Sequence, residues 1–330
     1  MQEFIILNTD EIRDIINMED VIEGVEKAYS LKCENLAELF PIVCHSFDGE
    51  DSEFDIKSGS MDGAGIFGMK LVSAFYGNDK YNLPRLTGTI LLFDRKTGRL
   101  KSTMDGGLIT NMRTGAAGAV GCKYLARPES ETLLLIGTGA QGPVLIDATL
   151  RVMKNIKKIL VCNPHSPEKT DTFIGTIVEQ YKIDIPVEKV NNLEEAVRNA
   201  DIILTATPSR EALIKRKWVK PGTHFSCIGS DMEGKQELDV EILKDASLFC
   251  DDLNQAVTVG ECEKAYKKGY IEENDITELG YVILGKNQGR KDDKEITVFD
   301  SSGIGLQDLM VSKCIAEKAE ETGVGTKMRL

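Results

Sequence analysis

The sequence predicts an α/β protein: a doubly wound parallel sheet of the Rossmann type, joined to a second domain that is rich in β-strands. From residue 132 onwards, short apolar runs alternate with helical patterns, which is the order of a parallel sheet built from βαβ units. Before residue 105 the pattern is different, because strand-like segments are separated by short turns. At 330 residues the chain is long enough for two domains, each able to bury a core.

The first domain begins with a short strand over 4–7 and continues into two helices. Asn8 caps the first helix, and Glu11, three residues further on, completes a possible capping box. The second helix begins near Met18, with apolar residues at helical spacing on one face. Three further segments have the pattern of strands and make the domain mostly β: 67–73, 88–93 and 99–104, the last two joined by a turn over 94–98.

A helix rich in alanine and glycine follows over about 110–125. Its small residues allow the helix to pack closely against another backbone, and this packing explains the alanines without a functional role. Arg113 stands near the predicted start of this helix, where a cation opposes the helix dipole. We therefore expect Arg113 to have an acidic or anionic partner.

The second domain is predicted from alternating strands and helices. Helices are expected over 167–181 and 193–199, and a last helix over 306–322 is expected to return to the first domain, since the sheet is by then complete. The candidate strands are 132–136, 158–162, 185–190, 202–206, 224–228, 247–250 and 295–300.

The strand over 132–136 leads into a glycine turn, Gly137-Thr-Gly139-Ala-Gln-Gly142, and then into a helix from about 140 to 153. This order suits a dinucleotide phosphate site, because Gly137 allows the tight turn and Gly139 allows close approach of a pyrophosphate. Gly142 allows the helix to pack against the strand, and the helix N-terminus offers free N–H groups to the phosphates. The motif alone also fits a glycine-rich loop without a ligand. The next strand ends at Asn163, where such folds place the residue that faces the adenosine ribose.

Three charged residues are candidates for chemistry. Asp231 follows the strand over 224–228, and ligands of parallel sheets bind beyond the carboxyl ends of the strands. The same sequence pattern also fits an aspartate that only stabilises a turn or caps a helix. Lys70 lies among apolar neighbours in a predicted strand. The alternative interpretation is a lysine that faces solvent and has no role in the site. Together with Arg113, Lys70 would hold a substrate carboxylate while Asp231 handles a substrate amine.

The composition limits the class of partner. The net charge of -13 argues against nucleic acid and against an anionic membrane, although a small anion still fits a locally basic pocket. None of the 8 cysteines forms a CxxC pair, which is typical of reduced thiols in a cytoplasmic protein. The three histidines are scattered, so no metal site is expected. We expect neither a signal peptide nor a membrane span.

A series of short motifs runs through most of the chain. In this order they resemble the ornithine cyclodeaminase and mu-crystallin family. The motifs are Gly68–Ser73 (GMKLVS), Asn82–Pro84, Leu91–Asp94, Thr97–Gly98, Asn111–Thr114 (NMRT), Leu135–Gln141 (LIGTGAQ), Thr205–Ser209 (TATPS), Lys220–Gly222, Gly229–Asp231 (GSD), Glu237–Asp239, Ser302–Gly303 and Gln307–Leu309.

The resemblance implies a substrate-binding and dimerisation domain over 1–113 with 306–330, a Rossmann domain over 114–305, and a homodimer. It implies that Lys70 and Arg113 bind the substrate carboxylate, and that Asp231, with Lys70, serves catalysis by assisting proton transfer at the substrate amine. It implies NAD or NADP as cofactor. The cofactor-binding residues carried over are Thr114, Gly137, Thr138, Gly139, Ala140, Gln141, Asn163, Thr205, Ala206, Thr207, Ser209, Ile228, Gly229 and Gly303.

The implied activity is hydride removal from the α-carbon of an L-amino acid to give an imine, followed by cyclodeamination of ornithine or a similar diamino acid. The alternatives are an amino-acid dehydrogenase, a reductase of cyclic imines, or a non-catalytic mu-crystallin-like binding protein.

Two departures from the family pattern bear on the substrate. The segment 39–45 lacks the arginine that many members carry, and Lys57 stands where cyclodeaminases have a glutamate, so a distal ammonium would be repelled. Lys57 or Arg85 is a candidate to replace the missing cation. Asn163, in place of an acidic residue, leaves the choice between NAD and NADP open.

Overall fold

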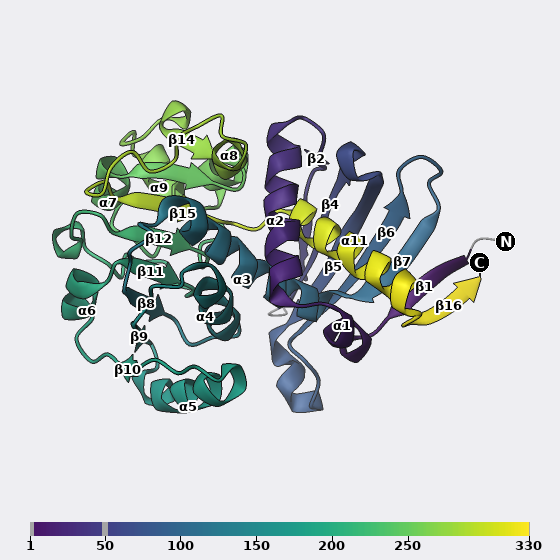
Figure 1. Cartoon of the computed structure of the whole chain (residues 1–330), viewed down its shortest axis with the longest axis horizontal. Helices are drawn as coiled ribbons and strands as arrows, with labels where there is room; N and C mark the ends of the chain where they lie inside the picture. Colours follow the sequence, from purple (N-terminus) through teal and green to yellow (C-terminus); the bar gives the residue numbers. More distant parts are fainter. Residues whose placement is uncertain (1–2, 48–51, 330) are drawn as a thin grey trace. The chain divides into compact units, whose positions relative to one another are not determined.

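The structure, a computed structural model, describes residues 3–47 and 52–329. The chain divides into two compact units, Met1–Arg113 with Ile304–Leu330 and Thr114–Gly303 (Figure 1). Helix α3 (Gly106–Leu125) begins in the first unit and continues into the second.

The first unit is built on a mostly antiparallel sheet with the order β16-β1-β7-β6-β5-β4-β2, in which β3 also pairs with β4. β1 lies parallel to β7 and antiparallel to β16. The strands are β1 (Glu3–Leu7), β2 (Glu38–Leu39), β3 (Val43–Ser46), β4 (Ser52–Met61), β5 (Ile66–Phe75), β6 (Leu86–Asp94), β7 (Leu100–Asp105) and β16 (Thr326–Arg329).

Helices α2 (Met18–Cys33) and α11 (Gly305–Thr322) pack on each other, and α11 also packs on strands β4 and β5 (Figure 1). Glycine in β5 allows this approach, because a Cβ atom at Gly68 would lie 2.8 Å from the side chain of Leu309. The short helix α1 (Thr9–Ile15) begins with the predicted capping box between Asn8 and Glu11. Two 3₁₀ segments complete the unit, η1 (Asp62–Ala64) and η2 (Tyr76–Tyr81).

The second unit contains a parallel sheet with the order β10-β9-β8-β11-β12-β15-β13-β14. Its strands are β8 (Thr132–Ile136), β9 (Lys158–Cys162), β10 (Val187–Lys189), β11 (Ile202–Thr205), β12 (His224–Cys227), β13 (Ser247–Cys250), β14 (Ile276–Glu278) and β15 (Thr297–Asp300). The helical segments are α4 (Gln141–Val152), η3 (Pro167–Lys169), α5 (Thr170–Tyr181), α6 (Leu193–Asn199), η4 (Arg216–Trp218), α7 (Val240–Asp245), α8 (Leu253–Thr258), α9 (Glu263–Lys267), η5 (Glu273–Asp275) and α10 (Leu279–Ile283).

Both faces of this sheet are buried. Leu133 and Leu135 of β8 belong to one apolar cluster, with residues of α4 and α5, whereas Leu134 and Ile136 belong to a second cluster on the other face. This arrangement explains why the strands read as continuous apolar runs rather than as alternating patterns. The strand order reverses at β8, so the carboxyl ends of β8 and β11 lie side by side and form the edge where such sheets bind ligands.

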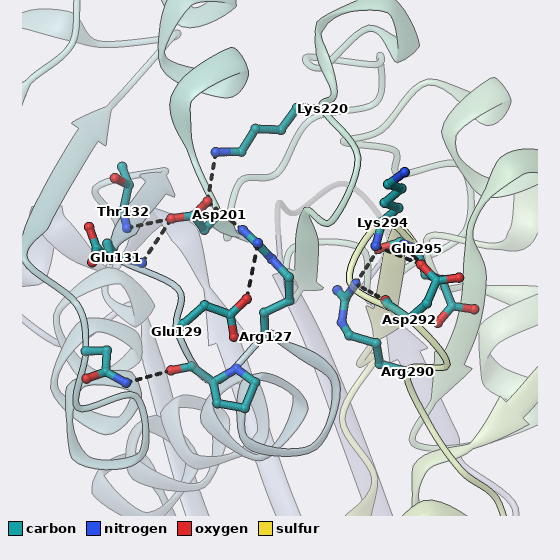
Figure 2. Close-up of polar contacts among 12 residues, drawn as sticks. Arg127, Glu129, Glu131, Thr132, Asp201, Lys220, Arg290, Asp292, Lys294 and Glu295 are labelled. Atoms are coloured by element: carbon teal, nitrogen blue, oxygen red, sulfur yellow. Dashed lines mark hydrogen bonds and ion pairs between the residues drawn. The ribbon is translucent and has the colours of Figure 1, made fainter.

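The amino-terminal edge of the same sheet is fixed by Asp201, the residue before β11 (Figure 2). Its carboxylate accepts hydrogen bonds from the backbone N–H groups of Glu131 (2.9 Å) and Thr132 (3.0 Å), and from Lys220 (2.8 Å) and Arg127 (3.0 Å). Partial burial opposes ionisation of Asp201, but the hydrogen bonds from Lys220 and the backbone outweigh it and lower the pKa of the carboxyl.

Most predicted elements agree with the structure within about two residues. Helix α3 differs, because it begins at Gly106 rather than near residue 110, so Arg113 lies in the helix interior and not at its start. The ten-residue strand β4, the short strands β2, β3, β14 and β16, and the short helices α7, α8, α9 and α10 were not predicted.

Candidate active site

A buried ionic cluster in the first unit contains both cations predicted to bind a substrate carboxylate. Lys70 points from β5 toward α11, and its Nζ donates to Asp308 Oδ1 at 2.8 Å and to Thr110 Oγ1 at 3.2 Å. Lys70 is only 2% exposed, so it is not the outward-facing lysine of the alternative interpretation. Asp308, in the first turn of α11, is fully buried.

Arg113 binds the same carboxylate from helix α3. Its Nε donates to Asp308 Oδ1 at 3.2 Å, and its Nη1 donates to Gln307 Oε1 at 2.9 Å. Gln307 in turn donates to the hydroxyl of Tyr29 at 2.5 Å. Asp308 is therefore the acidic partner that the sequence led us to expect for Arg113, although the reason given, a position at the helix start, was wrong.

The charges of the cluster shift the pKa values of its members. Burial and the nearby Arg113 lower the pKa of Lys70 to about 7, even though Asp308 acts in the opposite direction. Burial would raise the pKa of Asp308, but Arg113 and Lys70 outweigh it and lower that pKa. Lys57 of β4 stands directly opposite Lys70 of β5 in the sheet register and adds a third cation nearby.

Of the two candidates for a replacement cation, Lys57 and Arg85, the described contacts favour Lys57. Arg85 is exposed and forms an ion pair with Asp79, its Nε donating to Asp79 Oδ1 at 2.9 Å.

The predicted dinucleotide turn joins β8 to α4 in the second unit. Gly137 has φ +111°, and a Cβ there would lie 2.4 Å from the carbonyl oxygen of Ala206, which follows β11. No atom lies within 4 Å of the position of a Cβ at Gly139, so this residue faces open space. A Cβ at Gly142 would lie 3.0 Å from Phe173 of α5 and 3.1 Å from the carbonyl oxygen of Gly137, which directly follows β8. The turn thus leaves room beside Gly139 at the N-terminus of α4, as a bound pyrophosphate requires.

Asn163, at the end of β9, is fixed by three hydrogen bonds. Its Oδ1 accepts from the backbone N–H groups of His165 (3.1 Å) and Ser166 (2.9 Å), and its Nδ2 donates to Thr138 Oγ1 at 2.6 Å. The side chain therefore ties the glycine turn to the loop after β9. It supplies no carboxylate that would repel the 2′-phosphate of NADP.

The loops after β11, β12 and β15 carry the remaining residues predicted to bind the cofactor. Thr207 and Gly229 are joined by the carboxylate of Glu237, and the N–H of Gly303 donates to Asp251 at 2.8 Å. Sequence reasoning missed both carboxylates as parts of the site. The other predicted residues of these loops are Thr205 and Ala206, Ser209, whose hydroxyl donates to the carbonyl oxygen of Glu211 at 2.7 Å, and Ile228, which is buried.

Three predicted cofactor residues remain. Ala140 and Gln141 begin helix α4, and Thr114 is buried on α3, next to Gly115, at which a Cβ would lie 2.6 Å from the carbonyl oxygen of Val144 in α4.

Asp231, the predicted acid–base residue, lies in the loop after β12 and forms an ion pair with Lys235. Its side chain is 49% exposed. The neighbouring Ser230 is buried and its hydroxyl hydrogen-bonds Glu261 at 2.6 Å. The backbone of this loop is thus held in place while the Asp231 carboxylate stays open to solvent.

Over residues 3–47 and 52–329, no helix is long and apolar enough to cross a membrane. The same residues hold no group of three or more His, Cys, Asp or Glu side chains placed to bind a metal ion.

The model of one protein family matches residues 2–323, nearly the whole chain. The chain belongs to the ornithine cyclodeaminase/mu-crystallin family. The iminosuccinate reductase of Paracoccus denitrificans is 35% identical to it over 97% of this chain and 98% of the reductase. The alanine dehydrogenase of Archaeoglobus fulgidus is 37% identical over 99% of this chain and 98% of the dehydrogenase.

Solved structures of the family agree with the fold. The iminosuccinate reductase in complex with NAD+ aligns with a TM-score of 0.94 at 32% identity and covers 100% of both chains. The Thermococcus litoralis Δ(1)-pyrroline-2-carboxylate reductase, in complex with NADH and L-proline, aligns with a TM-score of 0.91 at 31% identity, covering 98% of this chain and 99% of the other. The predicted family, Rossmann fold and NAD(P)-dependent enzyme class are thus confirmed at the level of the family.

Proposed function

We propose that this protein is an NAD(P)-dependent oxidoreductase that interconverts a small L-α-amino acid and its imine, as an imine reductase or an amino-acid dehydrogenase. The observation that carries the proposal is the buried Lys70–Asp308–Arg113 cluster, in a chain that is similar over its full length to enzymes with these activities. When bound, NAD or NADP supplies or accepts the hydride at the substrate α-carbon.

Lys70 and Arg113 would hold the α-carboxylate of the substrate. Asp308 carries one negative charge against these two cations, so Lys70 and Arg113 together favour an anionic ligand. Holding the carboxylate fixes the α-carbon for hydride transfer, which supplies part of the rate acceleration by orientation.

Asp231 would move the proton at the substrate nitrogen. Its carboxylate is exposed, so the ion pair with Lys235 contributes little and can open when a substrate amine arrives. In the reducing direction, hydride adds to the imine carbon and a proton adds to the imine nitrogen. In the oxidising direction, both leave in reverse.

Lys57 favours this activity over the cyclodeamination of ornithine. Its ammonium group stands opposite Lys70, where the second ammonium of a diamino acid would meet like charge. Cyclodeamination, the first of the predicted activities, is therefore the less favoured alternative for this chain.

The fourteen residues predicted to bind the dinucleotide remain assigned to that role, from Thr114 on α3 to Gly303 after β15. Support comes from the open space at Gly139, the contact of Gly137 with the end of β11, and the N-terminus of α4. Asn163 is compatible with NAD and with NADP, because it places no negative charge near the ribose.

We also propose that the protein is a homodimer that associates through the first unit. Among the described residues of this unit, four large apolar side chains are more than half exposed: Val43, Tyr81, Leu83 and Leu86. Association would bury such side chains, and one solved relative is an archaeal alanine dehydrogenase dimer. Light scattering should give twice the 36.4 kDa chain mass. A cytoplasmic location also remains a prediction.

The activity is tested with a panel of substrates, and each reaction is monitored by the absorbance of the nicotinamide and by the release of ammonia. Pyruvate or oxaloacetate with ammonium, and preformed Δ(1)-pyrroline-2-carboxylate, are assayed with NADH and NADPH, and the amino acids are assayed with NAD and NADP. Consumption of NADH or NADPH supports the proposal. Ammonia released from ornithine without net NADH would show cyclodeamination instead. Dinucleotide binding without hydride transfer to any of them would indicate a binding protein.

A further inference from the structure

Two buried glutamates lie beneath the loops at the carboxyl edge of the parallel sheet. Glu237 is in the segment between β12 and α7, and Glu261 is between α8 and α9. Their exposed fractions are 0% and 1%. Buried carboxylates without a basic partner are uncommon, so the contacts of these two call for a specific explanation.

Glu237 connects two loops that are assigned to the cofactor. Its Oε1 accepts from the backbone N–H and the hydroxyl of Thr207, both at 2.7 Å, in the loop after β11. Its Oε2 accepts from the backbone N–H of Gly229 at 3.0 Å, in the loop after β12. A Cβ at Gly229 would lie 2.5 Å from Oε2, so this close approach requires glycine.

Glu261 supports Glu237 from below. Its carboxylate accepts from the backbone N–H groups of Glu237 (3.0 Å) and Leu238 (2.7 Å), and its Oε2 lies 2.6 Å from the hydroxyl of Ser230. The hydroxyl of Ser230 can donate to an ionised Glu261 or accept from a protonated one. With a proton on Oε2, Glu261 still accepts from the N–H groups of Glu237 and Leu238 through Oε1. In Glu237, by contrast, each oxygen accepts from a different backbone N–H.

The surroundings of the pair are negative or neutral. Burial raises the pKa of Glu237 to about 7, and burial together with the charge of Glu237 raises the pKa of Glu261 well above its usual range. Asp300 of β15 and the thiol of Cys227 in β12 also lie in this environment and interact with the glutamates. A proton on one of the two glutamates relieves their repulsion, and the Ser230 hydroxyl can accept it from Glu261, so we assign the proton to Glu261.

We propose that Glu237 is a positioning residue for the dinucleotide: it clamps the loops after β11 and β12 in the conformation that binds the cofactor, with protonated Glu261 as its support. The inference rests on the proposed function, because the loops matter only if a dinucleotide lies at this edge. Glu237 itself faces backbone groups, so it acts through Thr207 and Gly229 and does no chemistry.

The amide variants separate the two glutamates. In Glu237→Gln, the new NH₂ group must face the N–H of either Thr207 or Gly229, so one loop loses its bond and meets a second donor. In Glu261→Gln, the NH₂ group can donate to the Ser230 hydroxyl while the remaining oxygen keeps its backbone bonds.

Asp201→Asn serves as the matched control, because Asp201 also accepts two backbone N–H bonds but lies at the opposite edge of the same sheet (Figure 2). Calorimetric titration with NAD and NADP gives the dissociation constant of the wild type and the three variants, and a thermal melt gives their stability. We expect Glu237→Gln to weaken dinucleotide binding about 10-fold or more, through the loss of a hydrogen bond to a charged group. We expect Glu261→Gln to stay within about threefold of the wild type, and Asp201→Asn to lower the melting temperature with unchanged affinity.

If Glu237→Gln binds the dinucleotide as tightly as the wild type, the inference is overturned and the proposed function stands. Wild-type protein that binds neither NAD nor NADP overturns both. If Glu237→Gln does not fold, Glu237→Asp replaces it, because the shorter side chain keeps the charge but can reach only one of the two loops. The same loss of affinity is then expected, with unchanged affinity as the contrary result.

Discussion

Replacing Asp308 by asparagine should destabilise the first unit in a way that depends on pH. Asp308 is fully buried and its Oδ1 accepts from Lys70 at 2.8 Å and from Arg113 at 3.2 Å, so Asp308→Asn leaves two buried cations without a counter-charge. Breaking a buried ion pair from one side costs about 3–5 kcal/mol. Lys70, with a pKa of about 7, can lose its proton near neutral pH at a cost of about 1 kcal/mol or less. We therefore expect a loss near the lower limit, about 3 kcal/mol at pH 7.5.

The pH dependence of this loss follows from linkage. Without Asp308, the pKa of Lys70 in the folded state falls further below its unfolded value of 10.5. The unfolded chain then binds a proton that the folded chain does not, so the folded state becomes less stable as pH falls from about 10 toward the lowered pKa. The difference between wild type and Asp308→Asn should thus be larger at pH 6 than at pH 8.5.

Calorimetric melts of both proteins at the two pH values measure this difference, and a drop of roughly 10 °C corresponds to about 3 kcal/mol. The double variant Lys70→Met with Asp308→Asn is the control, because it also removes one of the uncompensated cations. It should be more stable than the sum of the single effects by about 1 kcal/mol or more. Additive single effects, with the same loss at both pH values, would refute this account of the cluster.

Three further predictions test single groups. Gly137→Ala should abolish dinucleotide binding and lower the free energy of unfolding by about 2 kcal/mol or more, because φ at this position is +111° and the Cβ would clash with the Ala206 carbonyl. Gly139→Ala should weaken dinucleotide binding and leave the melting temperature unchanged, because no protein atom lies within 4 Å of the Cβ position. Asp231→Asn should reduce kcat by about 100-fold or more with unchanged dinucleotide affinity, and full activity would remove Asp231 from the proposed proton transfer. Burial raises the pKa of Asp300 from 3.8 to about 7, so the folded state holds a proton that the unfolded state loses, and stability falls as pH rises through this range. Between pH 5 and 7 the free energy of unfolding should fall relative to Asp300→Asn by about 2 kcal/mol, and parallel curves would contradict this.

The fold could be predicted from the sequence because its main signals are local. Strands such as 132–136 and 158–162 are continuous apolar runs between turns and helices, and the structure places β8 and β9 at those residues. The start of α3 was predicted too late because two consecutive glycines are unfavourable in a helix, although β7 does end at Asp105. A Cβ at Gly106 would lie 2.9 Å from the backbone of Gly88 in β6, so the close packing at this position requires glycine.

The sequence identified the site residues that lie in recognisable motifs, but not the residues that hold them in place. Lys70 and Arg113 stood out as cations in unusual positions, but their shared partner Asp308 lies 238 and 195 residues away in the sequence. No spacing rule joins residues so far apart, and Asp308 entered only as the middle residue of the motif Gln307–Leu309, without a role. Glu237 and Glu261 were missed for the same reason, because a glutamate in a loop is normally solvated and only the fold buries these two.

Both units therefore use a buried carboxylate to fix groups that would otherwise have alternative conformations. In the first unit Asp308 orients two cations on different elements, and in the second Glu237 orients the backbone of two loops. Glu237 uses both of its oxygens, so an amide of the same shape must turn a donor toward one of the two loops. Asp308 accepts from both cations through Oδ1 alone, so at that position the negative charge is what an amide removes. The two substitutions should consequently have separate effects on kinetics. Asp308→Asn should raise KM for the amino acid or imine without changing the dissociation constant of the dinucleotide, and Glu237→Gln should do the reverse.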